Sequence, residues 1–221
     1  MADKPRVQAP KQRSGATPGD AGRGRQVAAA VAGLAAALIL GGVLYLAMGQ
    51  AESGPDVELV KADLDAAGCT LVAKKALSGE HTITDSGSTS PKWNTDPPTS
   101  GPHYAVAAVF NIYEDEVELA RVVHNLEHGG VFVLYGKDVP EATVEQLRDF
   151  YDDHKPGTIM APLDRLGDEF ALGAWVAHDD PAMGYLATCK SFDEDAVGAF
   201  FSGFQFRGPE HFDPSDLRPG H

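Results

Sequence analysis

"VVHNLEHGGVFVLY", residues 122–135, changes its pattern at a pair of glycines. The residues before the glycines, from about 115 to 128, read as a helix, and Gly129 is a typical helix stop. The residues after them, 131–136, are β-branched and aromatic, which predicts a short buried strand. A helix that turns so quickly into a buried strand indicates a sheet with helices packed on it.

The remaining elements mix strands and helices without a regular βαβ rhythm. Further helices are predicted at 53–68, 140–154 and 191–204, and further strands at 70–73, 157–163 and 170–178. We expect Ser53 to cap the first of these helices, and Ser191 with Glu194 to form a capping box at the last. Residues 78–104 are mostly Gly, Ser, Thr, Pro and Asp, which is typical of a long loop. The predicted fold class is α+β, one domain with a central mixed sheet and packed helices.

The N-terminal part of the chain has the pattern of a membrane anchor. Residues 27–48 carry no charged side chain over a length that spans a bilayer core. Six basic residues precede them against two acidic ones, a bias that keeps this end in the cytoplasm. The sequence therefore predicts a single-pass protein of the plasma membrane, with a disordered cytoplasmic tail at 1–26, a transmembrane helix at 27–48, an exterior domain at 53–210 and a flexible tail at 211–221. A signal peptide cleaved after 49–51 is the alternative.

The charge of the chain limits which partners it can bind, and its cysteines indicate the compartment. The net charge is −14 although the N-terminal segment is basic, so the exterior part is strongly acidic. An acidic surface repels phosphates, which excludes a nucleic-acid partner. Cys69 and Cys189 both fall in the exterior part, where thiols oxidise, and this predicts one disulfide. Catalytic or metal-ligating thiols are the alternative, which the lack of a CxxC spacing disfavours.

Two histidines one helical turn apart form a candidate metal site. His124 and His128 share one face of the predicted helix and can hold one metal ion. His103 lies in "DPPTSGPHY", residues 96–104, where prolines and a glycine give a stiff loop. Three neutral imidazoles outside the cytoplasm favour Cu(II) or Zn(II), with copper slightly ahead. Glu127 is expected to orient one of the imidazoles or to cap the loop.

Two other functions fit the same residues. The order H-x-x-E-H at 124–128 occurs in one class of zinc peptidases, so a zinc-dependent hydrolase with Glu127 as base is the first alternative. The helix stop one residue later and the size of the chain argue against it. The second alternative is a non-catalytic interaction domain whose histidines only tie loops together. Weaker metal candidates are His178, Met160 and Met183, while His154, His211 and His221 need no ligand role.

These motifs, with "EHTIT" at 80–84, resemble a bacterial family of membrane-anchored domains of unknown function, DUF3105, over about residues 69–210. The resemblance implies an anchored exterior domain without an assigned reaction. It marks as the family pattern His81, Pro97, Pro98, Ser100, Gly101, His103, His124, Glu127, His128 and Gly129. Trp93 stands where the family has a tyrosine, and a tryptophan expected soon after His103 is missing, which weakens any aromatic contribution to a pocket.

The leading prediction is therefore a membrane-anchored extracytoplasmic domain that binds copper or zinc. Its expected ligands are His103, His124 and His128, with His81 as a fourth candidate and with Glu127 and Ser100 supporting them. The expected role is metal handling or the assembly of an envelope protein, which would be the partner, and an enzyme is the less favoured reading.

Overall fold

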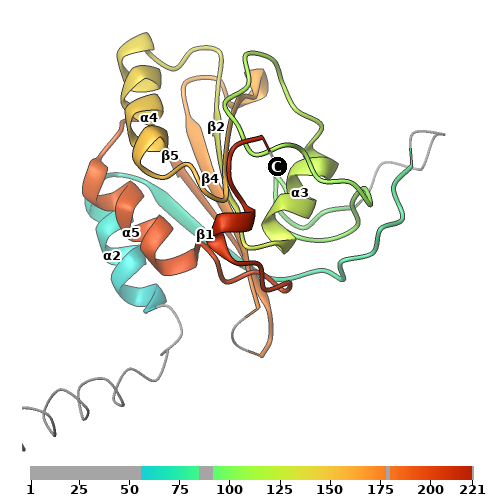
Figure 1. Cartoon of the computed structure of the whole chain (residues 1–221). Coiled ribbons are helices and arrows are strands. Elements are labelled where there is room, and N and C mark those ends of the chain that lie inside the picture. The colour runs from blue at the N-terminus through green and yellow to red at the C-terminus, as the bar shows by residue number, and fades with distance from the viewer. Residues whose placement is uncertain (1–55, 85–91, 178–179, 221) are drawn as a thin grey trace, which may run out of the picture. The chain divides into compact units, whose positions relative to one another are not determined.

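Strand β2 (Val131–Tyr135), which follows the two glycines, lies inside a five-stranded sheet. The computed structural model describes residues 56–84, 92–177 and 180–220. Within them the strand order is β1 (Thr70–Lys75), β5 (Met183–Cys189), β4 (Phe170–Val176), β2 and β3 (Thr158–Pro162) (Figure 1). Strands β2 and β3 are parallel, and the other neighbouring pairs are antiparallel. The prediction of an α+β fold with a mixed sheet is confirmed.

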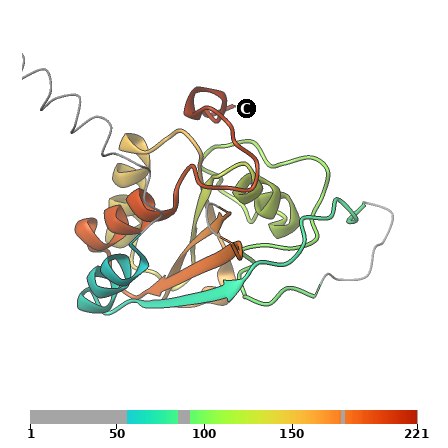
Figure 2. The ribbon, with the colours of Figure 1, turned by 90° about the horizontal axis from the view of Figure 1, so that it is seen from below.

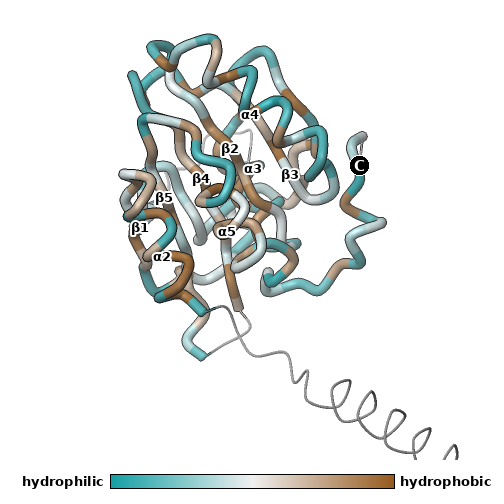
Figure 3. Tube along the Cα trace, turned by 90° about the vertical axis from the view of Figure 1, so that its left-hand side faces the viewer, coloured by the Kyte–Doolittle hydropathy of each residue, from teal (hydrophilic) through white to brown (hydrophobic). Residues whose placement is uncertain are grey.

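Helices cover both faces of the sheet. Helices α2 (Val57–Ala66), α4 (Glu141–Asp153) and α5 (Glu194–Phe204) lie on one face, and α3 (Leu119–Glu127) lies on the other (Figures 1 and 2). Alternate side chains of β2 follow this division, because successive residues of a strand point to opposite faces. Val131 and Val133 pack with α2, α4 and α5, whereas Phe132 and Leu134 pack with α3. Figure 3 shows the resulting hydrophobic centre of the fold around β2 and β4.

The helix starts differ from the predicted ones. The Asp56 carboxylate accepts a hydrogen bond from the Leu59 N–H and caps α2, while Ser53 lies outside the described residues. The capping box predicted for α5 is wrong, because Asp193 caps this helix through the Ala196 N–H, and Glu194 is its first residue. Helix α3 begins at Leu119 instead of about residue 115, so residues 115–118 belong to the preceding loop. Aspartate and serine are both good N-caps, so the sequence offers more than one possible first residue for α2 and for α5.

The predicted disulfide is confirmed. Cys69 directly precedes β1 and Cys189 ends β5, and the register of these antiparallel strands places the two residues opposite each other. Their Cα atoms lie 4.3 Å apart, and the bridge closes 120 residues of sequence separation. It therefore ties the edge strand of the sheet to its neighbour.

The N-terminal and C-terminal segments compare differently with the predictions. The predicted tail at 1–26 and the predicted transmembrane helix at 27–48 lie outside the described residues. No helix that the structure describes is long and apolar enough to cross a membrane. Residues 211–220, expected to be a flexible tail, contact the domain: they include the short 3-10 helix Pro214–Asp216, and Leu217 is buried and accepts a hydrogen bond from the Gly157 N–H.

Candidate metal centre

Three segments that are far apart in the sequence meet on the α3 side of the sheet. The last turn of α3 supplies His124 and Glu127, the Pro-rich loop supplies His103, and the segment after β1 supplies His81. The main chain holds the last two segments together, because the His103 N–H donates to the Glu80 carbonyl at 3.0 Å. A further bond runs from the Ile83 N–H to the His103 carbonyl at 3.3 Å.

The Pro-rich loop is fixed by side chains at two points. The Trp93 indole N–H donates to the Pro102 carbonyl at 3.1 Å. The buried Ser100 hydroxyl accepts a hydrogen bond from the Leu77 N–H at 3.0 Å. Ser100 therefore supports the loop rather than contacting an imidazole, and Trp93 holds the residue next to His103.

Backbone carbonyls fix the protonated nitrogen of two imidazoles. Nδ1 of His103 lies 2.7 Å from the Gly101 carbonyl oxygen, and Nδ1 of His124 lies 2.7 Å from the Tyr104 carbonyl oxygen. A carbonyl oxygen only accepts, so each Nδ1 carries the donated proton. In a neutral imidazole the other nitrogen, Nε2, then has a free lone pair. This arrangement is typical of metal-binding histidines.

The Glu127 carboxylate lies among these rings. Glu127 is 6% exposed, and its Oε2 is 3.0 Å from His103 Nε2 and 3.3 Å from His81 Nε2. Gly79 makes room for it, because a Cβ at this position would lie 2.2 Å from the Glu127 Oε1. Side-chain donor atoms of His81, His103, His124 and Glu127 all lie within 4.8 Å of one another. We call these four residues the donor cluster.

The distances from the Glu127 carboxylate to two of the imidazoles suit a small cation. Ligand atoms at about 2.0–2.1 Å from a tetrahedral zinc ion are about 3.3 Å from each other. The two contacts of Glu127, at 3.0 and 3.3 Å, agree with such an edge. The three imidazole rings also approach one another closely, with centroids 4.7 to 4.9 Å apart. Three nitrogens and one oxygen could therefore share one ion.

The environment of His103 favours its uncharged form. Burial lowers the pKa of His103 below its ordinary value, and the neighbouring His124 and His81 act in the same direction. The hydrogen bond to Gly101 and the charge of Glu127 oppose this shift. His81 is the accessible member of the cluster, since 42% of its side chain is exposed while that of His103 is fully buried. The donor cluster is thus buried at His103 and accessible to solvent at His81.

His128 lies beside the donor cluster, not in it. Helix α3 ends at Glu127, and His128, as the C-cap residue, already leaves the helix. Its Nε2 lies 3.2 Å from the Glu210 carboxylate, and its ring packs at a tilt against Phe212 with centroids 4.2 Å apart. It still touches the cluster, because its ring centroid is 4.6 Å from that of His124. Burial is the largest cause that lowers the pKa of His128.

Sequence reasoning assigned Glu127 a supporting role and did not connect Trp175 with the site. The three-residue spacing of His124 and Glu127, which puts both on one helix face, was the available signal for the carboxylate. Trp175 of β4 lies edge-on to His103 with ring centroids 6.2 Å apart, so an aromatic side chain of the sheet packs against the His103 ring. No such contact is visible in a sequence, because 72 residues separate the two.

The weaker candidates lie elsewhere. Met160 is fully buried in the core, and His211 is exposed. Met183 begins β5 and packs against the core. His154 stacks on Phe150 and donates from Nδ1 to the Phe150 carbonyl at 2.8 Å, as expected for a helix-ending histidine. His178 and His221 are outside the described residues.

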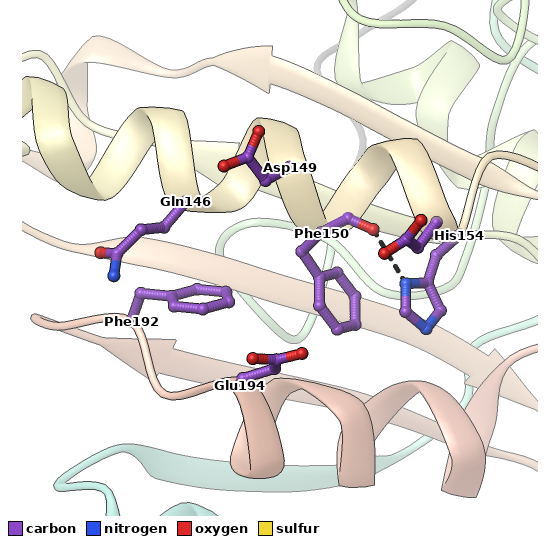
Figure 4. Close-up of a pocket in the computed structure, with 7 residues that line it drawn as sticks. Gln146, Asp149, Phe150, His154, Phe192 and Glu194 are labelled. Atoms are coloured by element: carbon purple, nitrogen blue, oxygen red, sulfur yellow. Dashed lines mark hydrogen bonds between the residues drawn. The ribbon is translucent and has the colours of Figure 1, made fainter.

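A pocket of about 230 Å³ lies between α4 and the start of α5 (Figure 4). Phe150 and Phe192 form its apolar part, and the carboxylates of Asp149, Asp153 and Glu194 surround it, with Gln146 and His154 completing the lining. None of these lining residues belongs to the donor cluster. The pocket and the cluster are separate features of the domain.

Comparison with known proteins gives one match. A family model described as "Protein of unknown function (DUF3105)" matches residues 86–216, which is more than half of the chain. The matched region includes His103, His124, Glu127 and His128, whereas His81 precedes it. No curated protein matches the chain, and no solved structure matches it.

Proposed function

The chain belongs to the DUF3105 family of proteins of unknown function, and we propose from its donor cluster that it binds one divalent transition-metal ion. The ligands are His81, His103, His124 and Glu127. The oxygen donor Glu127 takes the place that the sequence suggested for His128. The resulting set of three imidazole nitrogens and one carboxylate oxygen is a common one for such ions.

One observation carries this proposal. His103 uses Nδ1–H for the Gly101 carbonyl, and its Nε2 faces the Glu127 carboxylate at 3.0 Å. In the neutral imidazole, a lone pair would then point at a negative oxygen in a buried place, which is unfavourable without a cation between them. The cation is either a proton or a metal ion.

Burial argues against the proton. A doubly protonated His103 would be a buried imidazolium, and desolvation lowers its pKa. A metal ion accepts the lone pairs of His103, His124 and His81 together and also balances the charge of Glu127. The proximity of three imidazoles favours it, because three rings at 4.7 to 4.9 Å repel one another if more than one is protonated.

The chemistry of the donors selects the class of metal. Nitrogen and carboxylate oxygen ligands suit Zn(II) and Cu(II). Soft sulfur ligands, which Cu(I) prefers, are absent from the donor cluster, since both cysteines are bridged and Met160 is in the core. We therefore keep Zn(II) and Cu(II) as the two candidates.

The same geometry disfavours the hydrolase. A catalytic zinc ion keeps one coordination position for water, whereas the four protein donors here complete a tetrahedral set. Glu127 Oε2 already contacts two of the imidazoles, so this carboxylate is not placed as a free base for a water molecule. A closed set supports metal storage, delivery or a structural ion.

We place this function outside the cytoplasm, on a membrane anchor formed by residues 27–48. The Cys69–Cys189 disulfide supports an oxidising compartment. The apolar stretch and its basic flank support the anchor and the orientation. In that setting the domain would serve metal handling or the assembly of an envelope protein.

Metal titration of the full chain in detergent, without an affinity tag that contains histidine, tests the proposal. The wild type should bind one equivalent of Zn(II) or Cu(II), and His103→Ala and His124→Ala should each lose this binding. His211→Ala removes an exposed histidine and serves as the matched control, which should behave like the wild type. A folded wild-type protein that binds neither metal would leave the interaction domain, with histidines that only join loops, as the better account.

A further inference from the structure

Residues 206–212 cross the end of α3, and we call them the C-terminal strap. The Phe206 N–H donates to the Gly129 carbonyl at 2.7 Å, and the Glu210 N–H donates to the Glu127 carbonyl at 2.9 Å. Glu127 ends α3, where carbonyls lack intrahelical partners, and Gly129 lies just beyond the helix, so the two bonds satisfy carbonyl groups that would otherwise need water. The strap thus holds the main chain of the residue whose side chain is the oxygen donor of the cluster.

The strap lies directly on the backbone of α3. A Cβ on Gly208 would lie 2.3 Å from the Gly129 nitrogen and 2.4 Å from the Glu127 carbonyl oxygen. Only a residue without a side chain fits between these atoms. Any larger residue at 208 must lift the strap or push the end of the helix.

A second connection runs through side chains. His128 lies between the strap and the donor cluster: its Nε2 is 3.2 Å from the Glu210 carboxylate, and its ring meets the His124 ring edge-on at 4.6 Å. Phe212 covers its other side at 4.2 Å between centroids. The strap therefore contacts Glu127 through the main chain and His124 through the His128 ring.

We propose that the C-terminal strap sets the metal affinity of the donor cluster, with Glu210 and His128 as positioning residues. The inference rests on the proposed function, because it concerns the regulation of the same site. A docked strap holds Glu127 and His124 in the arrangement that the ion requires. Since binding free energies are reciprocal, the metal must strengthen strap docking by the same factor by which docking strengthens metal binding.

Two test variants of the full chain, each with its own control variant, leave all four metal donors unchanged. Gly208→Ala displaces the strap sterically, and Gly198→Ala is its matched control, since a Cβ on Gly198 meets nothing within 4 Å. Glu210→Ala removes the carboxylate beside His128, and Glu210→Gln retains an oxygen that can accept from this ring. Competition with a chromophoric chelator measures the zinc affinity of each. We expect Gly208→Ala and Glu210→Ala to weaken it by about 10–100-fold, with partial recovery in Glu210→Gln.

Hydrogen exchange tests the reciprocal effect, which a merely structural role would not produce. Saturating zinc should slow the exchange of the Phe206 and Glu210 amides in the wild type, and the Gly208→Ala change should reduce this slowing. Zinc binding by both variants within about twofold of the wild type, or strap exchange that zinc leaves unchanged, would overturn the inference while the proposed function stands. Absence of both Zn(II) and Cu(II) binding in the wild type would instead refute both the inference and the proposed function, and the titration of the wild type with the two metals separates the two failures.

Discussion

Replacement of Glu127 by glutamine distinguishes a metal ligand from a structural partner, because the two roles predict opposite effects in metal-free protein. Glutamine has nearly the same shape but no charge. Without metal, the amide N–H₂ can donate to the lone pair of His103 Nε2, which now faces a carboxylate at 3.0 Å. We therefore expect the free energy of unfolding in the presence of a chelator to stay within about 1 kcal/mol of the wild type, or to rise.

With metal, the change should be strongly destabilising. Loss of a group that only orients a ligand costs about 10–100-fold in affinity, so loss of the ligand itself should cost at least about 100-fold. At zinc concentrations about 1,000 times the wild-type dissociation constant, the ion stabilises the wild type by about 4.1 kcal/mol. The same concentration is about 10 times the dissociation constant of the variant and stabilises it by only about 1.4 kcal/mol. The expected loss is thus about 2.7 kcal/mol, present only with zinc.

Urea unfolding of the full chain, followed by tryptophan fluorescence with chelator and with zinc, measures both numbers. Glu145→Gln, at an exposed position of α4, is the matched control and should change neither. An equal loss of stability with chelator and with zinc would instead show that Glu127 acts as the ion-pair partner of a protonated His103, not as a metal ligand.

Three further outcomes follow from the structure. The Cys69–Cys189 disulfide joins residues 120 positions apart, so its reduction should lower the free energy of unfolding by about 5 kcal/mol in the chain-entropy model. Cys69→Ser should have the same effect in urea unfolding, and an unchanged urea midpoint would contradict the prediction. Burial lowers the pKa of both His103 and His128, so without metal the unfolded state binds more protons than the folded state. The free energy of unfolding should therefore be highest above the ordinary histidine pKa of about 6.5 and fall as the pH drops below it. Urea unfolding at several pH values measures this, and a free energy of unfolding that rises on acidification would contradict it. A C-terminal reporter that works only in an oxidising compartment should be active, and activity from a cytoplasmic reporter alone would reverse the proposed topology.

The sequence predicted the elements whose patterns are local. The strand at 131–136 and the helix before Gly129 follow from β-branched content and a glycine stop, and both are present as β2 and α3. The cysteine pair was also predictable, because the two thiols both fall in the segment that the sequence predicts to be outside the cytoplasm, and neither has a CxxC partner. These features need no knowledge of what packs against them.

Features that depend on distant partners were not predictable. The exchange of His128 for Glu127 in the donor cluster depends on α3 ending one residue early and on Glu210, 82 positions later, taking the His128 ring. The docking of residues 206–217 was equally unpredictable, because it uses main-chain hydrogen bonds and the buried side chain of Leu217 instead of a periodic apolar pattern. Likewise, Gly79 matters only because the Glu127 carboxylate lies against it.

The position of a bound metal ion shows whether the four side chains of the donor cluster hold one ion together. Anomalous diffraction at the zinc edge, from crystals grown with one equivalent of zinc, locates the ion without assuming its ligands. We expect one peak at about 2.0–2.2 Å from Nε2 of His103 and His124, a nitrogen of His81 and an oxygen of Glu127. A peak at other residues, or no peak either with zinc or, at the copper edge, with Cu(II), would show that the donor cluster does not hold a metal ion.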